Sequence, residues 1–221
     1  MARLLHVDSS LFAAEASVSK DIARTFRETW EREHPGGEVV HRDLGAEPVP
    51  PLSAHALVGG MTPAEQRTPE QLSALAVRAE LVDEVLAADA YLLAVPMYNW
   101  GVSAQFKVWL DQIIEQGRTM LPSGSPLAGR PATVVLSYGG GYFPGAPREG
   151  WDHVRPYLET VLEKALGLDV RFVVAQLTLA ERNPAMADLI PQAKEQRAAA
   201  HEAAAAQAKE IAALFAPVAA S

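Results

Sequence analysis

The fold is decided by the segment Tyr91-Leu92-Leu93-Ala94-Val95-Pro96-Met97-Tyr98-Asn99-Trp100-Gly101. Its first five residues form a continuous apolar run, which is typical of a central strand covered on both faces of a sheet. Pro96 ends the run, because proline has no N–H to donate to a neighbouring strand. Residues 132–136 repeat the pattern and end at a glycine-rich segment. Two such strands predict a parallel sheet.

Working outward from these strands, apolar runs alternate with segments of helical periodicity along the whole chain. Strands are expected at residues 4–7, 38–42, 91–95, 132–136 and 170–174, and helices at 17–34, 68–88, from 103, at 151–166 and from 184 onward. The proline-rich residues 47–63 are expected to form neither a helix nor a central strand. Alternation of this kind implies right-handed crossovers and a doubly wound five-stranded sheet in one α/β domain of residues 1–221.

Composition narrows the possible functions. The net charge is −8 and no basic run occurs, which disfavours binding to nucleic acid or to an anionic membrane. Cysteine is absent, which excludes disulfides, iron–sulfur ligation and a thiol nucleophile. The N-terminus shows no signal peptide and no apolar run is long enough to span a bilayer. We therefore expect a cytoplasmic protein.

Serines follow the first strand and begin the first helix. Ser9 and Ser10 come directly after the strand, and the segment Ser17-Val18-Ser19 starts the helix. A helix N-terminus offers free backbone N–H groups and a positive dipole end, which together bind phosphate. Ser17 could instead be an ordinary helix cap. Neither the P-loop pattern nor the dinucleotide fingerprint is present.

Aromatic and thioether side chains follow the central strand, in Met97, Tyr98, Asn99 and Trp100. Such side chains can lie against a planar ring, while the Asn99 amide can bond to the polar edge of that ring. The alternative is that they cover the end of the core, because pockets and cores are lined by the same residue types.

A glycine-rich loop, Ser137-Tyr138-Gly139-Gly140-Gly141-Tyr142, follows the next strand. Consecutive glycines let the backbone approach a ligand closely, although they also occur in flexible turns. All three loops follow parallel strands, so they lie at the same carboxyl edge. A phosphate site beside a planar-ring site is the outline of a pocket for flavin mononucleotide (FMN).

The remaining histidine, tryptophan and tyrosine residues give weaker evidence of function. His6 is interpreted as a packed side chain. The other five histidines are scattered and show no spacing typical of a metal site, so no metal is expected. Trp30 and Trp109 fall on apolar helix faces and are expected in the core. No residue is identified as a catalytic acid or nucleophile, and Tyr142 is only the best available proton donor.

The chain resembles the FMN-dependent NADH-azoreductase and NADH:quinone oxidoreductase family. The resemblance rests on Ser9-Ser10, the Ser-x-Ser helix start, Arg42-Asp43-Leu44, the segment Pro96-Met97-Tyr98-Asn99, the Ser-x-Gly-Gly loop and Tyr157-Leu158. It implies a flavodoxin-like fold with strand order 2-1-3-4-5 and helices on both faces. It also implies FMN as cofactor and a homodimer. The phosphate would be held by Ser10, Ser17, Val18 and Ser19, and the ring by Met97, Tyr98, Asn99, Trp100, Ser137, Tyr138, Gly139 and Gly140.

The resemblance implies two-electron transfer from NADH to a quinone, and also to aromatic azo compounds, by a ping-pong mechanism. One alternative is a flavodoxin-like carrier that binds FMN but does not itself oxidise NADH. Another is an α/β protein without flavin, such as an NAD(P)-binding regulator. The aromatic loop after the central strand and the length of the chain favour the enzyme.

Overall fold

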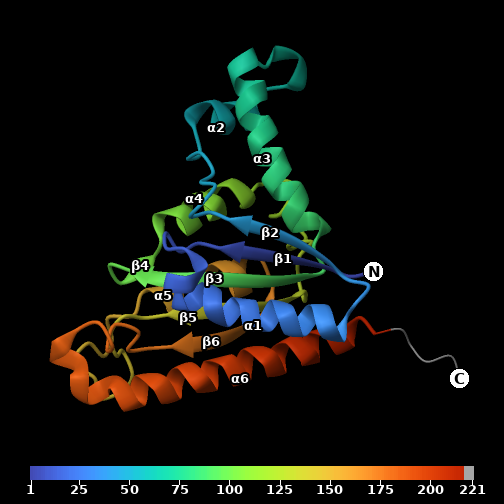
Figure 1. Ribbon diagram of the computed structural model, residues 1–221. Coiled ribbons are helices and arrows are strands. Elements are labelled where there is room, and N and C mark those ends of the chain that lie inside the picture. The colour runs from blue at the N-terminus through green and yellow to red at the C-terminus, as the bar shows by residue number, and fades with distance from the viewer. Residues whose placement is uncertain (217–221) are drawn as a thin grey trace, which may run out of the picture.

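The structure, a computed structural model, describes residues 1–216, so residues 217–221 at the end of the predicted C-terminal helix lie outside the described part. A parallel sheet forms the middle layer (Figure 1). Its strands are β1 (Arg3–Asp8), β2 (Glu38–Asp43), β3 (Ala90–Tyr98), β5 (Pro131–Ser137) and β6 (Asp169–Ala175), in the order β2-β1-β3-β5-β6. This is the predicted order 2-1-3-4-5. The two-residue strand β4 (Gly101–Val102) was not predicted, and it pairs antiparallel with the end of β3.

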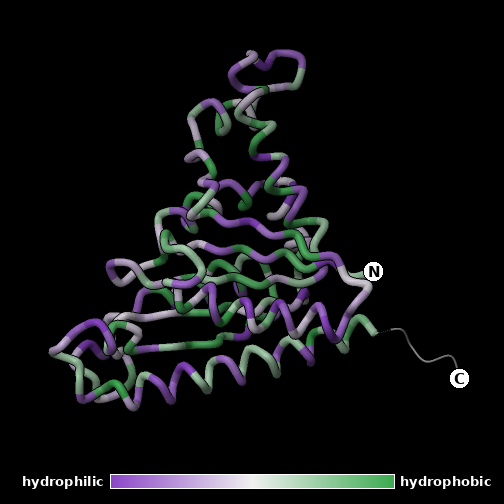
Figure 2. The backbone as a smooth tube through the Cα atoms, viewed as in Figure 1, coloured by the Kyte–Doolittle hydropathy of each residue, from purple (hydrophilic) through white to green (hydrophobic). Residues whose placement is uncertain are grey.

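Helices cover both faces of the sheet, as predicted. Helices α1 (Val18–Glu33) and α6 (Ile190–Leu214) lie side by side on one face, and α3 (Pro69–Ala87), α4 (Ala104–Ile113) and α5 (Val154–Leu158) cover the other (Figure 1). Hydrophobic residues concentrate in the middle strands, whereas hydropathy alternates along α6 (Figure 2). The alanines on the buried side of α6 are small, which lets it pack closely against α1.

The core forms where the sequence analysis places it. Trp30 and Trp109 are both buried, one on each side of the sheet. Helix α3 begins with the predicted cap, because Thr68 and Gln71 exchange side-chain and backbone hydrogen bonds and Pro69 takes the first helical position. No helix within residues 1–216 is both long and apolar enough to cross a membrane.

The expectation for the proline-rich region was wrong in one respect. Residues 54–61 form a helix, α2 (Ala54–Met61), which Ser53 caps by accepting a hydrogen bond from the Ala56 N–H at 3.2 Å. The helix forms because the prolines flank this interval and do not fall inside it. Together with the first turns of α3, α2 extends away from the sheet beyond β2 (Figure 1).

Two other helices differ from their predicted bounds. The expected helix at 151–166 begins only at Val154, because Asp152 Oδ1 accepts the Val154 N–H at 2.8 Å and leaves Trp151 outside. It then widens into a π-helix over Glu159–Ala165. The helix expected from residue 184 begins as a 3-10 turn, Pro184–Leu189, before α6.

Candidate functional site

The carboxyl ends of β1, β3, β5 and β6 enclose a cavity of about 250 Å³. Ligands in open α/β sheets bind at this edge, where the strand order reverses. Seven of the twelve residues predicted to bind a cofactor line the cavity: Ser10, Ser17, Val18, Met97, Tyr98, Ser137 and Gly139. The other five, which are Ser19, Asn99, Trp100, Tyr138 and Gly140, do not line it. All three predicted loops therefore reach one cavity.

The N-terminus of α1 forms one end of this cavity. Ser17 is the N-cap, and its Oγ accepts a hydrogen bond from the Lys20 N–H at 3.4 Å. The Ser19 side chain is fully buried behind it, with its Oγ 3.3 Å from Ser17 Oγ. Ser17 is thus both a helix cap and a cavity residue, so the two interpretations of this residue are compatible.

Tyr98 joins the first loop to the second. Its hydroxyl lies 3.4 Å from Ser10 Oγ and accepts a hydrogen bond from the Leu11 N–H at 3.2 Å. Ser9 faces away from the cavity, because its Oγ donates to the Ala94 carbonyl at 2.9 Å and fastens β1 to β3. Ser9 is therefore structural, whereas Ser10 faces the ligand space.

The second loop is a tight hairpin between β3 and β4. Met97 pairs with Val102 and Tyr98 with Gly101, which leaves Asn99 and Trp100 as a two-residue turn. Both turn residues have positive φ, 49° and 65°, as a type I′ hairpin requires. Positive φ is unusual for a tryptophan, and such outliers gather at functional sites.

The third loop divides its side chains between the cavity and the core. Ser137 and Gly139 line the cavity, but the Tyr138 side chain is buried and donates its hydroxyl hydrogen to Asp152 Oδ2 at 2.9 Å. Burial, together with the charge of Asp152, raises the pKa of Tyr138, so its hydroxyl stays protonated. Tyr142 packs edge-on against Tyr138 and is not among the residues that line the cavity.

A fourth segment, after β6, completes the cavity and was missed by the sequence analysis. It contributes Thr178, Leu179, Glu181 and Arg182, and α6 adds Arg197. The N–H groups of Leu177, Thr178 and Leu179 donate to the carbonyls of Gly140, Tyr138 and Gly139 at 3.0–3.2 Å. The segment also follows a parallel strand. The rule that the loops after parallel strands share one edge of the sheet could therefore have predicted its place at the cavity.

Glycine at position 139 leaves room for the Leu179 side chain of this fourth segment. A Cβ atom there would lie 2.7 Å from Leu179 Cδ1, so the half-exposed leucine side chain would have to turn aside. Arg197 Nη2 bonds Asp21 Oδ2 at 2.6 Å, and this ion pair joins α6 to the first turn of α1. The Arg182 guanidinium adds positive charge at the cavity, which suits a phosphate, whereas Asp21 neutralises Arg197. The carboxylates of Glu15 and Glu181 also line the cavity and oppose an anion.

An open hollow lies on the other side of Tyr98. It is lined by Tyr98, Asn99, Val102, Lys107, His153 and Tyr157 among others. Trp100 stands near it, about two-fifths exposed, with its ring edge-on to Trp151 at 5.8 Å between centroids. The β3–β4 hairpin thus contributes residues to both the cavity and the open hollow.

The structure also corrects the interpretation of the histidines as scattered. His6 on β1 and His41 on β2 are paired in register, and their rings lie 4.5 Å apart. Both contact Asp8. Sequence spacing could not show this, because the two histidines meet only through strand pairing.

A doubly wound sheet of order 2-1-3-4-5 with a cavity at its switch point defines a flavodoxin-like protein. The comparisons agree: a family model described as a flavodoxin-like fold matches residues 2–210. A protein of Streptomyces avermitilis named FMN-dependent NADH:quinone oxidoreductase is 48% identical over 216 residues, covering 98% of this chain and 100% of that protein. The Streptomyces coelicolor protein of the same name is 47% identical and covers 96% of each chain. The chain belongs to the flavodoxin-like family of FMN-dependent NADH:quinone oxidoreductases.

Solved structures show the same fold. An azoreductase from Bacillus anthracis superposes with a TM-score of 0.80 at 22% identity, covering 95% of this chain and 100% of that one. An FMN-dependent NADH-azoreductase from the same species, in complex with FMN, gives 0.78 at 21% identity, with coverages of 94% and 100%. At these identities the likeness supports the fold alone.

Proposed function

We propose that this protein is an FMN-dependent oxidoreductase that transfers two electrons from NADH to a quinone, and also to aromatic azo compounds. The observation that carries the proposal is the convergence of Ser10, Ser17, Tyr98 and Ser137 on one cavity at the switch point. The names of the relatives support the same cofactor, donor and acceptor.

The serines and free backbone N–H groups at the cavity are donors suited to FMN. The phosphate would lie at the N-terminus of α1, held by the Ser10 and Ser17 hydroxyls and by the first free N–H groups of the helix. Arg182 would add positive charge near that end of the cavity, whereas Arg197 is already paired with Asp21. Met97, Tyr98 and the Ser137–Gly139 backbone would border the ring. Ser19 would act by positioning Ser17, because their hydroxyl oxygens are 3.3 Å apart.

When bound, FMN supplies the chemistry, because it takes a hydride from NADH and returns two electrons to an acceptor. The chain supplies binding, orientation and exclusion of water. The open hollow beside Asn99 and Trp100 would receive NADH and then the acceptor in turn, which implies ping-pong kinetics. Tyr138 does not act as a proton donor in this proposal, because its hydroxyl is committed to Asp152.

We further propose that the protein acts as a homodimer in the cytoplasm. Leu57, Val58, Met61 and Leu72 are about half exposed or more, and they lie on the projecting α2–α3 segment. An exposed apolar set of this size is typical of an interface. Because NADH is an intracellular reductant, we place the activity in the cytoplasm.

Cofactor identity is tested by heating the purified protein and separating the released flavin by chromatography. We expect FMN, and recovery of FAD would contradict the proposal. Initial rates at several acceptor concentrations test the reaction order, and parallel double-reciprocal plots are expected. Intersecting plots would exclude a shared site.

A further inference from the structure

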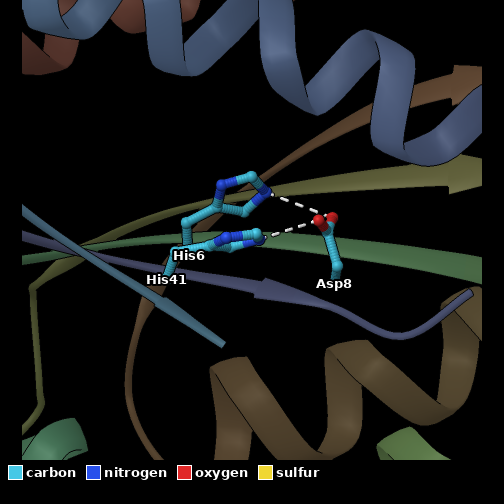
Figure 3. Close-up of side chains that lie close together, drawn as sticks. All are labelled: His6, Asp8 and His41. Atoms are coloured by element: carbon cyan, nitrogen blue, oxygen red, sulfur yellow. Dashed lines mark hydrogen bonds and ion pairs between the residues drawn. The ribbon is translucent and has the colours of Figure 1, made fainter. Parts of the chain in front are cut away.

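The pairing of β1 with β2 brings three ligand-type side chains together beneath α1. His6 is opposite His41, and Asp8 is opposite Asp43, so alternate residues of both strands face the same side of the sheet. His6 Nε2 lies 3.2 Å from Asp8 Oδ1, and His41 Nε2 lies 2.9 Å from Asp8 Oδ2 (Figure 3). The two imidazole rings are tilted by 30° and direct the same kind of nitrogen at one carboxylate (Figure 3).

The carboxylate of Asp8 is buried without a fixed positive charge. Asp8 is 5% exposed, and within residues 1–216 its only ion-pair partners are the two histidines. The nearby Lys20 is paired with Asp43 at 2.6 Å, and Arg27 lies 3.8 Å from Glu31. A buried carboxylate is costly unless a charge compensates it. Among the described residues, only the hydrogen bonds from the two imidazole rings offset its charge.

The chemistry of the three side chains also suits ligation, because zinc binds imidazole nitrogen and carboxylate oxygen. Both histidines direct Nε2 at the Asp8 carboxylate, so the three donor groups already face one another. An ion bound between them would replace the hydrogen bonds from the two rings to the carboxylate.

The donor atoms of the three side chains are also close enough together to bind one metal ion. One ligand atom from each residue can be chosen so that all three lie within 4.8 Å of one another. Zinc binds nitrogen and oxygen at about 2.0–2.2 Å, so co-ligands of a tetrahedral ion lie roughly 3.3–3.6 Å apart. His41 is about two-fifths exposed on the edge strand, which gives an ion a route in from solvent.

We propose that His6, Asp8 and His41 form a binding site for one divalent transition-metal ion, Zn²⁺ being the best match for two imidazoles and a carboxylate. The ion links β1 to β2 and neutralises the Asp8 carboxylate. Asp8 is two residues before Ser10, so the ion also fixes the end of the strand that leads into the cavity. The inference is independent of the proposed oxidoreductase activity.

Zinc titration of the untagged, FMN-loaded protein tests this site after treatment with a chelator. Calorimetry should give one Zn²⁺ per chain, and thermal unfolding should shift upward with zinc because the ion binds the folded state. His41→Ala and Asp8→Asn should each weaken zinc binding by roughly 10- to 100-fold or more. His55→Ala is the matched control, because His55 is an exposed histidine on α2, and it should bind zinc like the wild type.

Co²⁺ provides a second readout, since its ligand-field absorption lies at longer wavelength than the flavin bands and should appear in the wild type but not in His41→Ala. His41 is partly exposed, so its removal leaves the core intact. The proposal is overturned if wild type and His41→Ala bind zinc equally. It is also overturned if Asp8→Asn lowers the melting temperature while zinc leaves the wild type unchanged, because the cluster is then only a hydrogen-bonded one.

Discussion

Gly45→Ala tests whether the turn after β2 shapes the cofactor cavity. Asp43 Oδ1 accepts the N–H of Gly45 at 3.0 Å within the turn. The Leu44 N–H donates to the Asp8 carbonyl at 2.8 Å and holds the turn beside the end of β1. A Cβ atom at Gly45 would lie 2.0 Å from the Ser10 carbonyl oxygen and 3.0 Å from the Ser10 carbonyl carbon. Backbone cannot rotate out of the way as a side chain can. One of the two segments must therefore move by about 1 Å, a forced shift that typically costs about 1–3 kcal/mol.

Ser10 lines the cavity, so part of this cost falls on FMN binding. If the whole cost of about 1–3 kcal/mol falls on FMN binding, the dissociation constant for FMN rises roughly 5- to 150-fold. Quenching of flavin fluorescence during titration of the apoprotein measures the dissociation constant. Thermal unfolding of the apoprotein measures the part of the cost that falls on the stability of the fold. Gly36→Ala is the control, because a Cβ there has no neighbour within 4 Å. Wild-type FMN affinity and melting temperature in Gly45→Ala would refute this account of the turn.

Three further predictions address the site and the assembly. Ser17→Ala combined with Ser19→Ala should weaken FMN binding by about 1–3 kcal/mol for the Ser17 bond lost to the phosphate. The apoprotein should lose only about 1 kcal/mol for the lost cap, and an unchanged dissociation constant would leave Ser17 as a cap alone. Trp100→Ala should lower kcat/KM for the acceptor roughly 2- to 13-fold, because a stacking contact worth about 0.5–1.5 kcal/mol is lost, and it should change FMN affinity little. Weakened FMN binding with unchanged acceptor kinetics would instead place Trp100 at the cofactor. Sedimentation at micromolar concentration should give twice 23.7 kDa, and a fully active monomer would reject the homodimer.

The sheet could be predicted from sequence because its strands carry local signals. Continuous apolar runs mark β3 and β5. The serines after β1, the aromatic segment after β3 and the glycines after β5 mark the cavity edge. Helix α2 could not be predicted in the same way. Its residues lie between prolines, and only the Ser53 cap and the proline-free interval of residues 54–61 indicate a helix there.

Side-chain direction was the least predictable part of the site. Tyr138 and Ser137 are adjacent, yet one enters the core and the other the cavity because successive side chains of a strand alternate. Ser19 was expected to bind the phosphate, but the helical turn buries it behind Ser17. His6 and His41 are 35 residues apart, and only the register of β1 and β2 brings them together.

The central claim is that the chain itself catalyses electron transfer from NADH, and one steady-state assay tests it most directly. NADH oxidation by the FMN-loaded protein is followed with 1,4-benzoquinone as acceptor and compared with free FMN at equal concentration. We predict a turnover in the common enzymatic range of about 1–1,000 per second, far above free FMN. A rate no higher than that of free FMN would contradict the enzyme and favour a carrier that takes electrons only from a partner protein.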